Sequence, residues 1–217
     1  MRIAKLPKSF IQVIALCTWM QGTTYAVCPP GGGSAIVASE GKNSVRASND
    51  VYAGLPFSEG EELEFRVSYF NLDAGQLFFR VWEPKLFDQQ WHMSLESAAI
   101  TSEWYGKIFK AQDEGIAYII PGNYRAHQFK LTQDHKPLFG RHYTEDKLLT
   151  FDYSKCSVTE EFRDETGKVK KTKQADLDPD ATDILGALYK LRTVDFEKVK
   201  EERIKVYTSE KNWWLHS

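Results

Sequence analysis

The residues best suited to acid–base or metal chemistry in this 217-residue sequence are five histidines. They are His92, His127, His135, His142 and His216. None of them stands in an HExxH frame or at another spacing used by metalloenzymes. His135 and His142 flank residues 137–141 and could meet across a hairpin, but histidines of this kind are usually solvated. We therefore expect neither a metal site nor a catalytic histidine.

Carboxylates offer a second candidate, a calcium loop. Four of them lie close together: Asp176, Asp178, Asp180 and Asp183. An EF-hand loop that starts at Asp178 requires Gly at its sixth position and Glu at its twelfth, where this sequence has Asp183 and Tyr189. Helix capping explains these carboxylates without an ion. The sequence after residue 54 also lacks G-x-S-x-G, S-x-x-K and a glycine-rich phosphate loop, so no enzyme activity and no cofactor are predicted.

Large apolar side chains recur at alternate positions between residues 63 and 95, which is typical of a surface that could bind an apolar ligand. With one residue from a later segment, six of them form the predicted ligand-binding set: Phe65, Tyr69, Phe79, Trp91, Met93 and Leu188. Two interpretations fit this stripe. The side chains either pack the core, as such stripes usually do, or line a pocket in a curved sheet.

The charge of the chain argues against nucleic-acid binding. There are 28 Lys and Arg residues against 30 Asp and Glu residues, whereas phosphate backbones are bound by clustered cations. The densest cluster is Lys168, Lys170, Lys171 and Lys173. It follows Glu165 in a turn-like stretch, so we interpret it as the solvated tip of a hairpin.

Residues 1–26 have the three zones of a secretory signal peptide. Three basic residues precede an apolar run over residues 10–20, and small or polar residues follow it up to Ala26. We expect cleavage after Ala26 and a mature chain that is periplasmic or secreted and has no transmembrane span. An uncleaved anchor is disfavoured because the apolar run spans about 16 Å of helix, roughly half of the hydrocarbon core.

Export also changes how the cysteines are interpreted. Cys17 lies in the leader, so the mature chain holds Cys28 and Cys156 in a compartment where thiols oxidise. A Cys28–Cys156 disulfide would add about 4 to 5 kcal/mol in the chain-entropy model. Residues 27–54 are rich in Gly, Ser, Ala and Asn and predict a flexible lead-in, which leaves open whether the bridge forms. Lipidation of Cys17 or Cys28 is disfavoured because the residue before each is large.

A period of two predicts a single β-rich domain over residues 55–217. The clearest strand covers residues 62–69, and residues 76–82 and 91–97 repeat its alternation. Further strands are expected at residues 116–120, 124–132, 138–143, 148–153, 157–163, 203–207 and 213–215. Residues 101–111 fit a short helix capped by Ser102 or an edge strand or loop, and we favour the strand or loop.

One segment has the period of a helix. Asp178 is expected to cap it, with Pro179 in its first turn. Its apolar stripe consists of Ile184, Leu185, Leu188 and Leu191. Because short connections imply antiparallel strands, the predicted fold is mainly β (β-rich α+β), a curved antiparallel sheet or incomplete barrel wrapped around one amphipathic helix.

Two stretches resemble a known family. Residues 55–69, LPFSEGEELEFRVSY, followed by Asp73-Ala74-Gly75, resemble the opening of the exported bacterial family called domain of unknown function 3108. Residues 183–192, DILGALYKLR, resemble that family's helix. The resemblance implies a secreted or periplasmic β-rich protein and supplies no established reaction. Members of the family continue through further strands, which implies that this chain is truncated at its C-terminus.

Together these features predict a non-catalytic periplasmic module that binds or carries a hydrophobic or amphiphilic envelope molecule, such as a lipid. The alternative is a structural or assembly factor of the cell envelope. Such a factor would act on another envelope protein through its surface or through an exposed sheet edge.

Overall fold

The computed structural model describes residues 51–69, 72–199, 201–208 and 211–216. These residues form ten strands and two helices. The strands are β1 (Glu62–Tyr69), β2 (Leu72–Phe87), β3 (Gln90–Thr101), β4 (Phe109–Ile119), β5 (Ala126–Pro137), β6 (Tyr143–Asp152), β7 (Ser157–Arg163), β8 (Val169–Asp176), β9 (Arg203–Thr208) and β10 (Lys211–His216). The helices are α2 (Glu103–Gly106) and α3 (Ile184–Leu191). The predicted signal peptide and most of the predicted lead-in lie outside the described residues.

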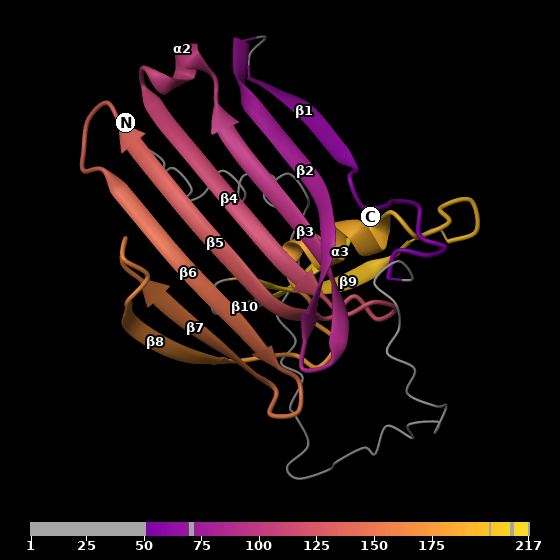
Figure 1. Cartoon of the computed structure of the whole chain (residues 1–217). Coiled ribbons are helices and arrows are strands. Elements are labelled where there is room, and N and C mark those ends of the chain that lie inside the picture. The colour runs from indigo at the N-terminus through magenta and orange to yellow at the C-terminus, as the bar shows by residue number, and fades with distance from the viewer. Residues whose placement is uncertain (1–50, 70–71, 200, 209–210, 217) are drawn as a thin grey trace, which may run out of the picture.

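Strands β1 to β8 form one antiparallel sheet in which every strand pairs with its neighbours in the sequence (Figure 1). Strands β9 and β10 pair with each other in a separate hairpin. The order of the large sheet is linear, with β1 and β8 as its edges in the described part of the chain, so the sheet is open and not a closed barrel. The predicted mainly β fold with antiparallel pairing is confirmed.

One face of this sheet, called the inner face, carries the hydrophobic core. Side chains alternate along a strand, and the strand register aligns Val81, Leu95, Ala117, Phe129 and Leu149 in one row across β2 to β6. All five side chains are buried. Burying a large apolar side chain contributes about 1.5–3 kcal/mol, so this row is a main source of stability.

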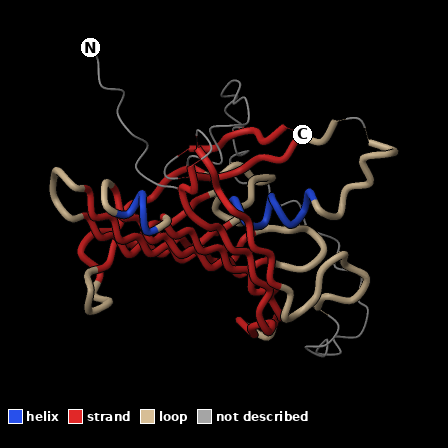
Figure 2. Tube along the Cα trace, turned by 90° about the horizontal axis from the view of Figure 1, so that it is seen from above, coloured by secondary structure: helices blue, strands red, loops and turns tan. Residues whose placement is uncertain are grey.

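Helix α3 contributes to the same core. Its residues Leu185 and Tyr189 are buried and belong to one hydrophobic cluster with the sheet residues. Figure 2 shows α3 and the β9–β10 hairpin on the same side of the sheet. The helix therefore packs on the inner face.

Helix α3 begins five residues later than the sequence predicts. Its cap is Asp183, whose carboxylate accepts a hydrogen bond from the Gly186 N–H at 2.6 Å. Asp178 is buried and instead accepts hydrogen bonds from the Asp180 N–H and from Lys205 Nζ, the latter at 2.6 Å. The predicted cap is wrong because the lysine on β9 and a local turn occupy the Asp178 carboxylate.

Thr182 joins three parts of the fold immediately before α3. Its N–H donates to the Lys205 carbonyl on β9, and its own carbonyl accepts from the Tyr207 N–H. Its hydroxyl donates to the carbonyl of Tyr124, in the β4–β5 connection, at 2.5 Å. A Cβ at Gly186 would lie 2.4 Å from Thr182 Oγ1 and 3.0 Å from the Tyr124 oxygen. This close approach requires glycine at position 186.

Three other sequence predictions are wrong. A strand was expected at residues 138–143, but β5 continues to Pro137 and residues 138–142 connect it to β6. Within residues 101–111, Ser102 caps the short helix α2, and β4 then begins at Phe109. The lysine run that was expected to form a hairpin tip lies mostly in β8. There, Lys171 and Lys173 lie over the ring of Phe162 on β7. Cation–π attraction to this ring favours a strand that is otherwise rich in like charges.

Replacing Gly186 by alanine tests the packing at the start of α3. The added Cβ would overlap the Thr182 hydroxyl, so Gly186→Ala should lower the free energy of unfolding by about 1–3 kcal/mol, although alanine favours helices over glycine. Gly106→Ala in α2 is the control, since a Cβ there approaches only Thr101 Oγ1, at 3.9 Å. Urea unfolding measures both variants. A Gly186→Ala variant as stable as the wild type would contradict the packing.

Burial raises the pKa of the Asp183 carboxyl from its ordinary value of 3.8 to about 7. The unfolded chain releases this proton near pH 4, so the folded state binds more protons between about pH 4 and pH 7. The contribution of this carboxyl to stability is therefore complete below about pH 4 and is lost as the pH rises to about 7.

Asp183→Asn should remove this part of the pH dependence and keep a side-chain oxygen that caps α3. Unfolding free energies measured from about pH 4.5 to pH 7.5 should fall in the wild type relative to the variant as the pH rises. Asp180→Asn changes an exposed carboxylate and should follow the wild type. The same slope in all three proteins would rule out a raised pKa at Asp183.

Candidate functional site

Polar side chains continue the inner face beyond the apolar row. Six of them are buried, and their alternate positions on β3 to β7 direct them to the same side of the sheet as the core. This inner polar cluster consists of Ser97, Asp113, Gln133, His135, Lys147 and Glu160. Buried polar groups in such number on one face mark it as the candidate site.

A pair formed by Asp113 on β4 and His135 on β5 lies within this cluster. His135 Nε2 is 2.6 Å from Asp113 Oδ1, and the two side chains are 7% and 0% exposed. Gln133 stands directly opposite Asp113 in the register. The rings of Phe109 and Tyr143 lie 5.5 and 5.9 Å from the imidazole. The carboxylate and these rings fix the orientation of a buried imidazole.

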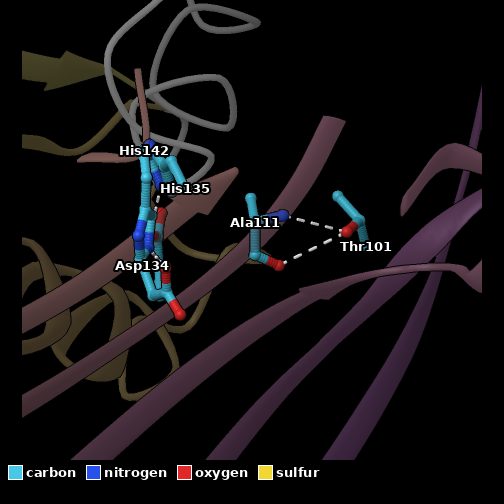
Figure 3. A network of polar contacts seen from close by, with 6 residues as sticks. Thr101, Ala111, Asp134, His135 and His142 are labelled. Atoms are coloured by element: carbon cyan, nitrogen blue, oxygen red, sulfur yellow. Dashed lines mark hydrogen bonds and ion pairs between the residues drawn. The ribbon is translucent and has the colours of Figure 1, made fainter. Parts of the chain in front are cut away.

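A second His–Asp pair lies next to the first in sequence. Asp134 bonds His142 of the β5–β6 connection, and this hydrogen bond lowers the pKa of Asp134 (Figure 3). Alternation along β5 turns Asp134 away from the inner face. The side chain of Asp134 is 39% exposed, and that of His142 is 49% exposed. The two histidines that flank this hairpin therefore bond different carboxylates: His142 bonds Asp134, and His135 bonds Asp113.

Two members of the inner polar cluster have no hydrogen-bond partner within the part of the chain that is described. They are the hydroxyl of Ser97 and the amide nitrogen of Gln133, both almost fully buried. Leaving such a group unpaired costs about 1–3 kcal/mol. The residues beside them on the same face are small: Ala99, Ala111 and Gly115. The Phe129 ring lies against Gly115, where a Cβ would come within 3.0 Å of it, so the face holds these unpaired hydrogen-bonding groups in a packed interior.

Lysines gather on the inner face at its β6–β8 side. The ammonium nitrogens of Lys147, Lys171 and Lys173 lie 4.8, 5.9 and 5.3 Å from the centre of the Phe162 ring. Lys147 is buried and lies 3.5 Å from a carboxylate oxygen of Glu145. The ring attracts all three cations and concentrates positive charge on this side of the face.

Glu160 connects the inner face to the β9–β10 hairpin. The Tyr207 hydroxyl donates to Glu160 at 2.7 Å, and both side chains are buried. Burial and this carboxylate raise the pKa of Tyr207 above its ordinary value. The tyrosine therefore stays protonated and continues to donate to Glu160.

The predicted ligand-binding residues lie at the core and along its border. Met93 is fully buried in the core. Phe79, Trp91 and Leu188 pack against the core with part of their surface exposed. These three side chains contact the interior on one side and are accessible on another. Their role in ligand binding stays a prediction.

Two further members of that set lie on β1. Phe65 is half exposed, and its ring meets that of Phe79 edge-on at 5.9 Å. Tyr69 is the last residue of β1, and its side chain lies outside the described residues. The structure thus brings Phe65 next to Phe79 on the inner face, at the edge of the sheet.

No sequence motif marks the inner polar cluster, but a periodic signal does. In β4, Ala111, Asp113, Gly115 and Ala117 alternate with more exposed residues. An acidic residue at an inward position between small residues indicates a polar site on a buried face. His135 occupies an inward position on β5, opposite Ala111.

A surface cleft of about 510 Å³ lies apart from this cluster. It is lined by Gly54, Leu55, Pro56, Gly122, Tyr124, Arg192 and Thr193. The Arg192 guanidinium already bonds both carboxylate oxygens of Glu61 and lies 5.2 Å from the rings of Phe57 and Tyr189. This arginine joins the segment before β1 to the end of α3, so the cleft is better explained as a structural joint.

Cys156 takes part in a disulfide. Cys28, its predicted partner, lies outside the described residues, so that pairing stays a prediction. In the part of the chain that is described, no three His, Cys, Asp or Glu side chains are grouped so that they could hold a metal ion. Neither described helix has the length and hydrophobicity needed to cross a membrane.

Comparison with protein families agrees with the two motifs. The family model described as "Protein of unknown function (DUF3108)" matches residues 64–216, which is well over half of the chain. The chain belongs to this family. The DUF3108 match includes most of β1 and extends to the end of β10, so the resemblance seen in the sequence is confirmed. No curated protein and no solved structure matches the chain.

The two His–Asp pairs of this DUF3108 protein provide a matched test of burial. His135→Phe leaves the buried Asp113 carboxylate without its histidine and should lower the free energy of unfolding by about 3 kcal/mol or more. His142→Phe breaks the exposed pair and should cost less than about 1 kcal/mol. Urea unfolding at neutral pH measures both. Equal losses would contradict the assignment of the Asp113–His135 pair to the interior.

Proposed function

We propose that this protein binds an amphiphilic molecule of the bacterial cell envelope on the inner face of its sheet and catalyses no reaction. The observation that carries the proposal is the change from apolar to polar side chains along that one face. The polar part of the face includes the buried hydroxyl of Ser97 and the buried amide nitrogen of Gln133, which have no hydrogen-bond partner among the described residues. An amphiphile has the same two-part character and would match both regions.

The apolar part of the ligand would contact side chains at the border of the core. Phe79, Trp91 and Leu188 are partly exposed there, and Phe65 extends this apolar surface to the sheet edge. The predicted wrapping of the sheet around α3 belongs to the same proposal, since Leu188 of the helix would cover the ligand from the other side.

The polar part of the ligand would meet the inner polar cluster. The Ser97 hydroxyl and the Gln133 amide can both donate to an acceptor oxygen. The strand register places Lys147 in the same row as Ser97, where its ammonium, now paired with Glu145, could also bond a ligand oxygen. A head group with carboxylate, phosphate or ester oxygens therefore fits best.

A periplasmic or secreted location forms part of this proposal. It is supported by the three zones of residues 1–26 and by the disulfide at Cys156, because structural disulfides persist in oxidising compartments. Envelope lipids and fatty acids are the abundant amphiphiles that a protein meets there.

A role as a structural or assembly factor is the second candidate, and the open sheet favours it. Strands β1 and β8 are edges, and an edge strand has backbone groups that can pair with a strand of another protein. In that case the binding partner would be an envelope protein and not a lipid.

Native mass spectrometry of the protein purified from the periplasm without detergent tests the proposal. We expect an adduct with the mass of a lipid or fatty acid on the wild type. Gln133→Leu removes a buried donor and should lower the ratio of bound to free protein about tenfold, corresponding to the loss of one good hydrogen bond. Gln112→Leu changes an exposed glutamine on the other face of β4 and should keep the adduct.

Each failure has a distinct meaning. An adduct that Gln133→Leu leaves unchanged would place the ligand elsewhere and contradict the site. A wild type without an adduct, even after incubation with palmitate or lysophosphatidylglycerol, would contradict the function. A co-purifying envelope protein with no lipid would favour the assembly role.

A further inference from the structure

Two neighbouring connections extend from one end of the sheet. The first joins β3 to β4 through α2, and the second joins β5 to β6 (Figure 1). A backbone hydrogen bond from the Leu138 N–H to the Ile108 carbonyl, 2.7 Å long, holds them together. The two connections therefore form one continuous surface.

This surface exposes large apolar side chains. Trp104 is 52%, Ile108 51%, Leu138 59% and Phe139 88% exposed. We name these four residues the apolar tip. Single exposed apolar residues are common, but a group of four on two adjoining connections marks an interaction surface.

Cations surround the apolar tip. Lys107, Lys110, Lys136 and Arg141 are exposed on and beside the two connections. The carboxylates within residues 102–111 and 134–142 are Glu103 and Asp134. Asp134 forms an ion pair with Lys136, so the charges of these two offset each other and Lys107, Lys110 and Arg141 stand against Glu103. This region is therefore cationic, whereas the chain as a whole has more acidic than basic residues.

Hydrogen bonds fix the first connection so that its apolar side chains stay exposed. Ser102 accepts from the Tyr105 N–H as the α2 cap and donates to the Asp73 carbonyl at 2.6 Å. Thr101 Oγ1 bonds both the N–H and the carbonyl of Ala111, which extends the β3–β4 pairing to the base of α2 (Figure 3). These bonds hold the backbone of the β3–β4 connection in the geometry that leaves Trp104 and Ile108 exposed.

We propose that the apolar tip inserts into the interfacial region of an anionic lipid bilayer. Trp104 would lie at the level of the head groups, as tryptophans of membrane proteins do, and Phe139, Leu138 and Ile108 would reach the acyl boundary. The surrounding lysines and the arginine would bind anionic head groups. The charge pattern favours anionic lipid, since Lys107, Lys110 and Arg141 outnumber the one carboxylate of these connections that has no lysine partner, Glu103.

This inference goes beyond the proposed function and does not depend on it, because it concerns other residues. If both hold, the apolar tip would bring the protein to the membrane from which an amphiphile is taken or to which it is delivered. Loss of membrane binding alone would leave ligand binding on the inner face untouched.

Flotation with vesicles tests the proposal. Vesicles of phosphatidylglycerol and phosphatidylethanolamine should bind the wild type at low salt, whereas vesicles of phosphatidylcholine alone, or 0.5 M NaCl, should weaken binding at least about tenfold. The double variant Leu138→Ser/Phe139→Ser should lose binding to the anionic vesicles by a similar factor. Circular dichroism melting should show it folded, because these side chains are exposed.

The matched control is Leu86→Ser/Phe196→Ser, which removes a leucine and a phenylalanine that are 50% and 51% exposed elsewhere on the molecule. It should bind vesicles like the wild type, and any binding by residues 1–26 is common to all three proteins. Equal losses in the two double variants, or no binding by the wild type, would overturn the proposal. So would a wild-type dimer that the tip variant dissociates in the absence of vesicles.

Discussion

The packing at the start of α3 is the constraint on which the rest of the structure depends. Thr182 uses its backbone to pair with β9 and its hydroxyl to bond the β4–β5 connection, so one residue joins the helix, the hairpin and the sheet. Asp183 then caps the helix. Because Gly186 has no side chain, α3 can lie close to the Thr182 hydroxyl and the Tyr124 carbonyl. Because these contacts fix the position of α3, Leu185 and Tyr189 reach the core. A larger residue at position 186 would separate all three elements at once.

The inner face combines two environments that usually exclude each other. Its apolar row supplies the stability of the fold, and its polar cluster places a His–Asp pair and unpaired polar groups in the same interior. Apolar residues in the place of Ser97 and Gln133 would remove the cost of burying them without partners. The presence of such groups on the face is the physical basis of our proposal that it binds a ligand.

The two surfaces that we propose as ligand-binding surfaces lie on different parts of the same sheet, one along the strands and the other on the connections at one end. The inner face is built from strand interiors, where the pairing register fixes each side chain. The apolar tip is built from the connections at the strand ends, where local hydrogen bonds hold the backbone. A meander of long antiparallel strands produces both, because every second connection emerges at the same end of the sheet. The protein can therefore present two unlike surfaces from one simple topology.

Local patterns in the sequence determined most of the strands, helix α3 and the family, although they placed a strand at residues 138–143, where β5 and β6 are connected, and missed β8. Alternation located β1 and β7 at the residues found, Glu62–Tyr69 and Ser157–Arg163, and the apolar stripe located α3. These features could be predicted because they depend on neighbours within one or two turns or pleats.

Only the tertiary structure decided the helix cap, since Asp178 is bound by Lys205, which lies 27 residues away. It likewise decided the Asp113–His135 pair, 22 residues apart, which forms because β4 and β5 pair in one register. A one-residue change in that register would turn one of the two side chains to the opposite face, and no local pattern specifies it.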